Sequence, residues 1–121
     1  MQRSMMQVFV KGSIEAVKLY KTAFDADVLC TYAAENGGYM HSELNAHGQI
    51  IAVSEIAEDI IVGNTMMFCF QFGPGGERNV RKAYEVLKEG ASSCTPIGPC
   101  DYSTCQFTLT DKFGVCWCVY V

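Results

Sequence analysis

The hydrophobic positions of this chain follow two different spacings, and each spacing predicts one kind of element. Residues 5–10 are mostly apolar and predict a strand. Gly12 and Ser13 then interrupt the apolar run, and Ser13 has a side chain typical of a helix N-cap. The apolar residues that follow recur at helical spacing: Ile14, Val17, Tyr20 and Phe24. The chain is therefore predicted to begin with a strand and an amphipathic helix.

Three further strands are expected before the middle of the chain. Two turn signals separate them, Asn36-Gly37-Gly38 and Ala46-His47-Gly48. The strands themselves are predicted over residues 28–34, 39–46 and 49–54. The first half thus has the order βαβββ.

The second half repeats this order without visible sequence identity. An aromatic-rich strand is predicted over residues 65–72, and a Gly/Pro segment at 73–76 ends it. A helix follows, with apolar residues at Val80, Ala83, Tyr84 and Leu87. Three more strands are expected over residues 91–97, 102–109 and 113–120, the last two joined by a tight turn at Asp111–Gly114. In this turn Gly114 is expected to supply a backbone angle that other residues resist.

Length and composition indicate a single globular domain spanning residues 1–121, built from modules at about 1–60 and about 61–121. Half of the residues are hydrophobic and 18% are charged, and the net charge is −4. With no basic cluster, a nucleic acid or an anionic membrane is not expected as a partner. No apolar run reaches the roughly 20 residues of a membrane span, and no signal-peptide pattern is visible. We therefore expect a cytoplasmic protein.

The seven cysteines are expected to be structural. Free cysteine packs as a small hydrophobic residue, and a reducing cytosol keeps it unpaired. A zinc site is the alternative, but the chain has no C-x-x-C pair and no histidine at a suitable spacing. A single disulfide or a redox role stays open.

Three segments together resemble one known family. They read G-S-I-E-A-V-K-L-Y from Gly12, M-H-S-E-L from Met40 and D-K-F-G-V-C-W-C-V-Y from Asp111. In this order and at these distances they resemble the PhnB-like branch of the glyoxalase/bleomycin-resistance/dioxygenase (vicinal oxygen chelate) superfamily. The resemblance implies an α+β fold, in which two βαβββ modules form one curved, cupped mixed sheet with the helices on its outer face. It also implies a homodimer and a concave site for a small molecule.

The resemblance also marks the positions at which related enzymes hold a divalent metal ion. These positions fall near Met5 and Gln7, within residues 52–55, at Met66 or Met67, and near Cys118. Glu55 is the one good hard ligand among them, and thioether sulfur is a poor ligand for such ions. We therefore predict no metal and no other cofactor. The alternative is a lyase, isomerase or dioxygenase that depends on Zn, Ni, Fe or Mn.

His41 and Glu43 are the candidate catalytic residues. In a strand they point to the same face, and a histidine beside a carboxylate can act as a general base. The other interpretation is that this face is solvated or lies at a dimer contact. The resemblance and the predicted strands suggest six ligand-pocket residues: Gln7, Glu55, Met67, Tyr102, Trp117 and Cys118.

The favoured function is small-molecule binding in a cupped, metal-free site. Whether the protein is an enzyme stays open, and no substrate follows from the sequence.

Overall fold

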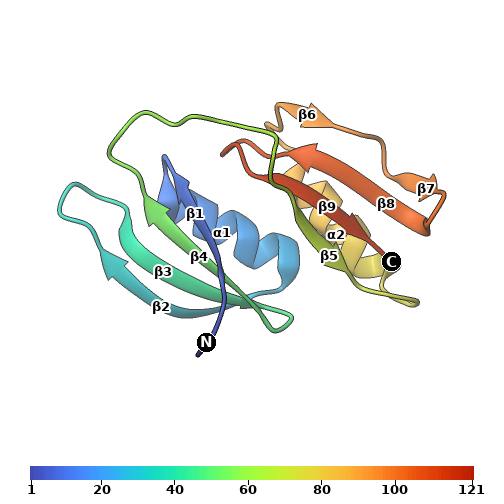
Figure 1. Ribbon diagram of the computed structural model, residues 1–121, viewed down its shortest axis with the longest axis horizontal. Helices are drawn as coiled ribbons and strands as arrows, with labels where there is room; N and C mark the ends of the chain where they lie inside the picture. Colours follow the sequence, from blue (N-terminus) through green and yellow to red (C-terminus); the bar gives the residue numbers. More distant parts are fainter. The chain divides into compact units, whose positions relative to one another are not determined.

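The computed structural model describes residues 1–121, which divide into two compact units, Met1–Ile61 and Val62–Val121. Each unit contains one helix and one mixed sheet, and in each the helix lies against one face of its own sheet (Figure 1). The predicted α+β class and the two βαβββ modules are confirmed. Neither helix has the length and apolar character needed to cross a membrane.

The first unit follows the predicted element order. Its elements are β1 (Met6–Val10), α1 (Ser13–Phe24), β2 (Asp27–Ala33), β3 (Tyr39–Ala46) and β4 (Gln49–Glu55). The strand order is β1-β4-β3-β2, with β1 parallel to β4 and the other pairs antiparallel. Because the side chains of a strand alternate between faces, one face of this sheet packs on α1 and the other does not. The packed face and the helix share the buried side chains of Val10, Val17, Tyr20, Phe24, Leu44, Ile51 and Val53.

The second unit has a similar plan. Its elements are β5 (Phe68–Gln71), α2 (Glu77–Leu87), β6 (Ser93–Cys94), β7 (Gly98–Cys100), β8 (Ser103–Thr110) and β9 (Cys116–Tyr120). The strand order is β5-β9-β8-β6, and β7 also pairs with β8. As in the first unit, the first strand runs parallel to the last one. Its core contains Val80, Leu87, Phe107, Leu109, Trp117 and Val119.

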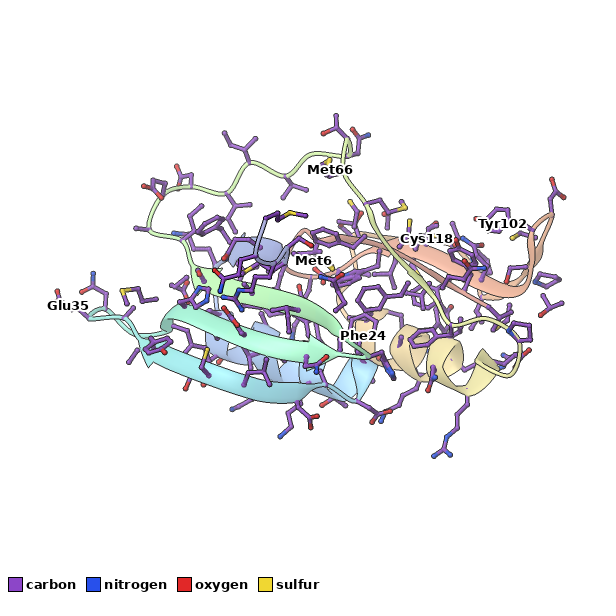
Figure 2. All side chains as sticks on the ribbon, turned by 60° about the horizontal axis from the view of Figure 1, so that its bottom comes forward. Met6, Phe24, Glu35, Met66, Tyr102 and Cys118 are labelled. Atoms are coloured by element: carbon purple, nitrogen blue, oxygen red, sulfur yellow. The ribbon has the colours of Figure 1, made fainter.

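Two predicted strands of the second unit have different bounds. The strand expected over residues 65–72 is shorter, so Met66 and Met67 precede β5, and Figure 2 shows Met66 on the loop before it. The strand expected over 91–97 is replaced by the short strands β6 and β7, with Pro96 between them. Proline has no backbone N–H to give to a ladder, which explains the interruption.

The turn before β9 is built around the buried carboxylate of Asp111. Its Oδ1 accepts hydrogen bonds from the backbone N–H groups of Phe113 and Val115, at 2.8 and 3.1 Å. Its Oδ2 accepts a hydrogen bond from Trp117 Nε1, at 2.9 Å. Gly114 has φ +89°, as expected, and a Cβ there would lie 2.8 Å from a methyl group of Val62. One carboxylate thus joins the turn to the largest buried side chain of the unit.

Candidate functional site

The sheet face of the first unit that turns away from α1 carries polar side chains on β1 and β3. Gln7 on β1 pairs with Ala52 on β4, Ala52 pairs with Glu43 on β3, and Glu43 pairs with Cys30 on β2. Residues paired in this way point to the same face of a sheet. The register therefore brings Gln7 and Glu43 to one side although they lie 36 positions apart in the sequence.

We call five residues of this face the Glu43 network: Arg3, Gln7, His41, Glu43 and Ser54. Arg3 and His41 contact Glu43, and Gln7 contacts Ser54 beside them. The side chain of Glu43 is only 9% exposed. Arg3 binds it with both terminal nitrogens, Nη1 to Oε2 at 2.9 Å and Nη2 to Oε1 at 2.8 Å. The ring nitrogen Nε2 of His41 lies 3.0 Å from Oε1. A carboxylate removed from water thus has an ionic partner and a second hydrogen-bonding partner, as a buried charge requires.

These contacts decide the protonation of Glu43. The hydrogen bonds from Arg3, and then the one from His41, lower the pKa of Glu43 to about 2. The carboxylate is therefore ionised at neutral pH and is a poor proton acceptor there. The structure brings His41 and Glu43 together, and in this pair His41 is the candidate base while Glu43 orients it. A catalytic role for either residue stays a prediction.

The depressed pKa predicts a pH dependence of stability. Glu43 has an ordinary pKa of 4.5 and a folded-state pKa of about 2. The unfolded chain therefore binds the proton more tightly, so the stabilisation is full above pH 4.5 and is lost as the pH falls to about 2. We expect Glu43→Gln to reduce the loss of stability in urea melts between these pH values. An equally steep loss in Glu43→Gln and in the wild type would contradict this assignment.

The remaining members of the network and two aromatic rings complete this face. Gln7 Nε2 donates to Ser54 Oγ at 3.2 Å and to the carbonyl of Val8 at 3.0 Å. Phe9, two positions beyond Gln7 on β1, is 59% exposed. Tyr32 on β2 is 55% exposed, and its ring centroid lies 6.4 Å from that of His41. This sheet face thus carries charged and amide groups as well as exposed aromatic rings.

Arg3 is the charged member of this network that the sequence did not indicate. It precedes β1 and lies 40 positions from Glu43, in a segment without a motif. The sequence pattern predicts the strand that follows Arg3. It does not predict which residues of other strands lie beside a residue that precedes this strand.

Glu55 was predicted as a pocket residue and as the best metal ligand. It lines a hollow of about 670 Å³ together with Gly12 and Gly38, and its carboxylate also binds the start of α1. Its Oε2 accepts from the N–H of Gly12 at 3.0 Å, and its Oε1 accepts from the N–H and hydroxyl of Ser13 at 2.9 and 2.8 Å. Glu55 therefore caps the N-terminus of α1, and these contacts, the Ser13 N–H first, lower its pKa. Ser13 is not the N-cap: its hydroxyl accepts from the N–H of Tyr39 at 2.7 Å.

The four remaining predicted pocket residues lie in the second unit: Met67, Tyr102, Trp117 and Cys118. Trp117 has no exposed surface and bonds Asp111, so it belongs to the core and not to an open pocket. Met67 precedes β5 and is 47% exposed. Cys118 is 5% exposed.

Tyr102 differs from these residues because it lines a hollow. The hollow has a volume of about 670 Å³, and Gln71, Cys100 and Thr104 also line it. The electrostatic interaction with Cys118, then burial and the interaction with Cys100, raise the pKa of Tyr102 to about 12, so its hydroxyl is a hydrogen-bond donor at neutral pH.

Comparison with known proteins gives the fold a name. No family model and no curated protein matches the sequence. Among solved structures, the PhnB protein from Bacillus cereus is 18% identical, with a TM-score of 0.82 over 98% of each chain. Protein PA1353 from Pseudomonas aeruginosa is 18% identical, with a TM-score of 0.81 over 99% of this chain and 97% of that one. The chain has the glyoxalase/bleomycin-resistance fold.

A third similar structure contains a metal ion. The fosfomycin resistance protein FosX from Listeria monocytogenes, in complex with Mn(II) and sulfate, is 14% identical, with a TM-score of 0.71. The match covers 98% of this chain and 88% of that one. At these identities the likeness shows the fold and no shared activity.

The residues at the expected metal positions of this fold do not suit a hard divalent ion. Both oxygens of Glu55 bind the start of α1, and Gln7 binds Ser54 and Val8. Met67 and Cys118 offer sulfur, which hard ions bind weakly. No group of three or more His, Cys, Asp or Glu side chains is placed to hold a metal.

Proposed function

We propose that the protein binds a small molecule that carries an oxyanion and an aromatic or apolar body, without a metal ion, at the Glu43 network. The observation that carries this proposal is the ionised, largely buried carboxylate of Glu43, paired with Arg3 and His41 on a sheet face that does not pack on a helix. An ion pair with one exposed partner contributes little net stability, because solvent screens the attraction. A strongly shifted pKa beside a specific charged partner is, in contrast, typical of functional sites.

The chemistry of the ligand follows from the groups that remain free to bind it. Arg3 has five N–H donors and is 55% exposed at the side chain, and only two of its donors are given to Glu43. Guanidinium N–H groups match carboxylate and phosphonate oxygens in geometry. Phe9 and Tyr32 on the same sheet face can contact an aromatic ring.

Phenylphosphonate combines both features and serves as the probe. In buffer with EDTA, we expect it to raise the melting temperature of the wild type. A ligand at a hundred times its Kd stabilises the folded state by about 2.7 kcal/mol. Arg3→Gln should reduce the shift, whereas Arg78→Gln, which removes an exposed arginine of α2, should leave it unchanged.

Two results would contradict the proposal. One is an equal rise in melting temperature for the wild type and Arg3→Gln, which would mean that phenylphosphonate does not bind at Arg3. The other is a shift that requires Zn, Ni, Fe or Mn, which would favour the alternative of a metal-dependent lyase, isomerase or dioxygenase. Benzyl alcohol, which has the ring without the oxyanion, is the matched control ligand and should give little shift.

A homodimer is part of the proposal. Strand β2 is an edge strand of its sheet, and Leu29 and Tyr32 on it are more than half exposed. Exposed edges with apolar side chains favour pairing with another chain. We expect light scattering at micromolar concentration to give twice the chain mass of 13.3 kDa, and a mass of one chain would contradict this.

A cytoplasmic location is also part of the proposal. A net charge of −4 without a basic cluster supports a protein that binds neither nucleic acid nor an anionic membrane. If the protein is an enzyme, His41 is the candidate general base of this network, held by Glu43.

A further inference from the structure

Two thiols of the second unit face each other across neighbouring strands. Cys69 on β5 and Cys118 on β9 are direct partners in the parallel ladder. The neighbouring partners, Phe68 with Trp117, pack their rings with centroids 5.7 Å apart on the side of α2. Side chains alternate along a strand, so both thiols point to the opposite face.

The surroundings of this pair are polar and reachable. Cys69 is exposed, while Cys118 is 5% exposed. Gln106 Nε2 lies 3.6 Å from Cys118 Sγ. Tyr102 and Cys118, both labelled in Figure 2, come from the same unit, and the two side chains interact. One thiol is thus open to an incoming ion, and the other is held among hydrogen-bonding groups.

The separation of the strands argues against a direct disulfide. Neighbouring strands lie about 4.8 Å apart, and side chains stand roughly perpendicular to the sheet, so the two Cβ atoms keep about this separation. A disulfide needs Cβ atoms about 3.8 Å apart. A bond between Cys69 and Cys118 is therefore disfavoured at the usual strand separation, whereas an ion bound by both sulfurs does not need the strands to approach each other.

We propose that Cys69 and Cys118 form a two-thiolate site for Cu(I). Soft thiolate ligands select this ion over harder ones. Two S–H bonds lose their protons to solvent as two Cu–S bonds form, and because the ion arrives as Cu(I), no electron is transferred. Both cysteines belong to the second unit, whereas the Glu43 network belongs to the first.

Zinc does not fit the same pair. Structural zinc sites have four ligands, and no group of three or more metal-ligating side chains occurs in the structure. Cys116, two positions before Cys118 on β9, is engaged with Thr110 and with the carbonyl of Gly63. The pair thus offers two sulfurs, which suits an ion that accepts two ligands.

The test is an anaerobic titration of the fully reduced protein with the acetonitrile complex of Cu(I), in competition with bicinchoninate. We expect the tightest binding to saturate at about one ion per chain, with two sulfur ligands in X-ray absorption spectra. Cys69→Ser should weaken this binding by more than about a hundredfold, because loss of even a supporting group costs 10- to 100-fold. Cys94→Ser is the matched control: Cys94 is also exposed, and its thiol bonds the carbonyl of Thr95.

Three outcomes would overturn the proposal. They are unchanged affinity in Cys69→Ser, an equal loss in Cys94→Ser, or three sulfur ligands in the absorption spectra. Rapid oxidation of the pair to a disulfide by glutathione disulfide would also contradict the geometric argument. Cys118→Ala should lose the site as well, and because Cys118 is buried, a urea melt checks that the variant is folded.

Discussion

Asp111→Ala is expected to lower the free energy of unfolding by about 3–5 kcal/mol, as measured by urea denaturation. The carboxylate of Asp111 is 1% exposed and accepts from Phe113, Val115 and Trp117. Its removal leaves a buried indole N–H without an acceptor and releases the turn that sets the register of β9. An unsatisfied buried donor costs about 1–3 kcal/mol, and each hydrogen bond to a charged group contributes about 1.5–3 kcal/mol.

Two further variants make this result specific. Asp101→Ala removes an exposed aspartate of the same unit and should change stability by less than about 0.5 kcal/mol. Asp111→Asn keeps the shape and one acceptor oxygen, so its loss should lie between those of the two alanine variants. A small effect of Asp111→Ala would mean that the turn does not depend on this carboxylate.

Two adjacent glycines in the turn between β2 and β3 are expected to differ sharply. Gly37 and Gly38 have φ values of +87° and +78°, so alanine is strained at both. At Gly37 an added Cβ meets nothing within 4 Å, and we expect a loss of about 1–2 kcal/mol from the backbone alone. At Gly38 the Cβ would overlap Glu55 Oε1 and lie 2.8 Å from Ser13 Oγ. Gly38→Ala should therefore cost about 3–5 kcal/mol, because it also displaces the cap of α1.

A double-mutant cycle tests the cause of this difference. If Gly38→Ala acts by displacing the carboxylate, Glu55→Ala should cost less in the Gly38→Ala background than in the wild type. Additive losses, or equal losses at Gly37 and Gly38, would show that Glu55 is not the group affected.

Most of the fold could be predicted from the sequence because it follows from the local pattern of apolar and turn-forming residues. Apolar spacing and Gly-rich turns placed both helices and most strands, and the Asp111–Gly114 turn was recognised from its residues. The single strand predicted over 91–97 was wrong because the prediction ran through Pro96, which lies between the short strands β6 and β7. Proline lacks the backbone N–H that a strand ladder needs, wherever it occurs. The sequence alone could therefore have predicted a break in the strand at this proline.

The site was less accessible because it depends on contacts between distant segments. The shared face of His41 and Glu43 follows from strand alternation and was predicted. Arg3 binds Glu43, and Glu55 binds the start of α1. Both contacts depend on how strands β1, β3 and β4 pair and on where these strands end. Glu55 looked like a ligand because it is a carboxylate at the end of a strand, and sequence does not say which backbone N–H groups lie within its reach.

Amide chemical-shift mapping with phenylphosphonate in the presence of EDTA tests most directly whether the protein binds a small oxyanion at the Glu43 network without a metal. The proposal predicts that the backbone signals that move most belong to Gln7, Phe9, Tyr32, His41 and Glu43, and that Arg3→Gln suppresses these changes. Shifts confined to the second unit, or no shifts until a divalent metal ion is added, would contradict it.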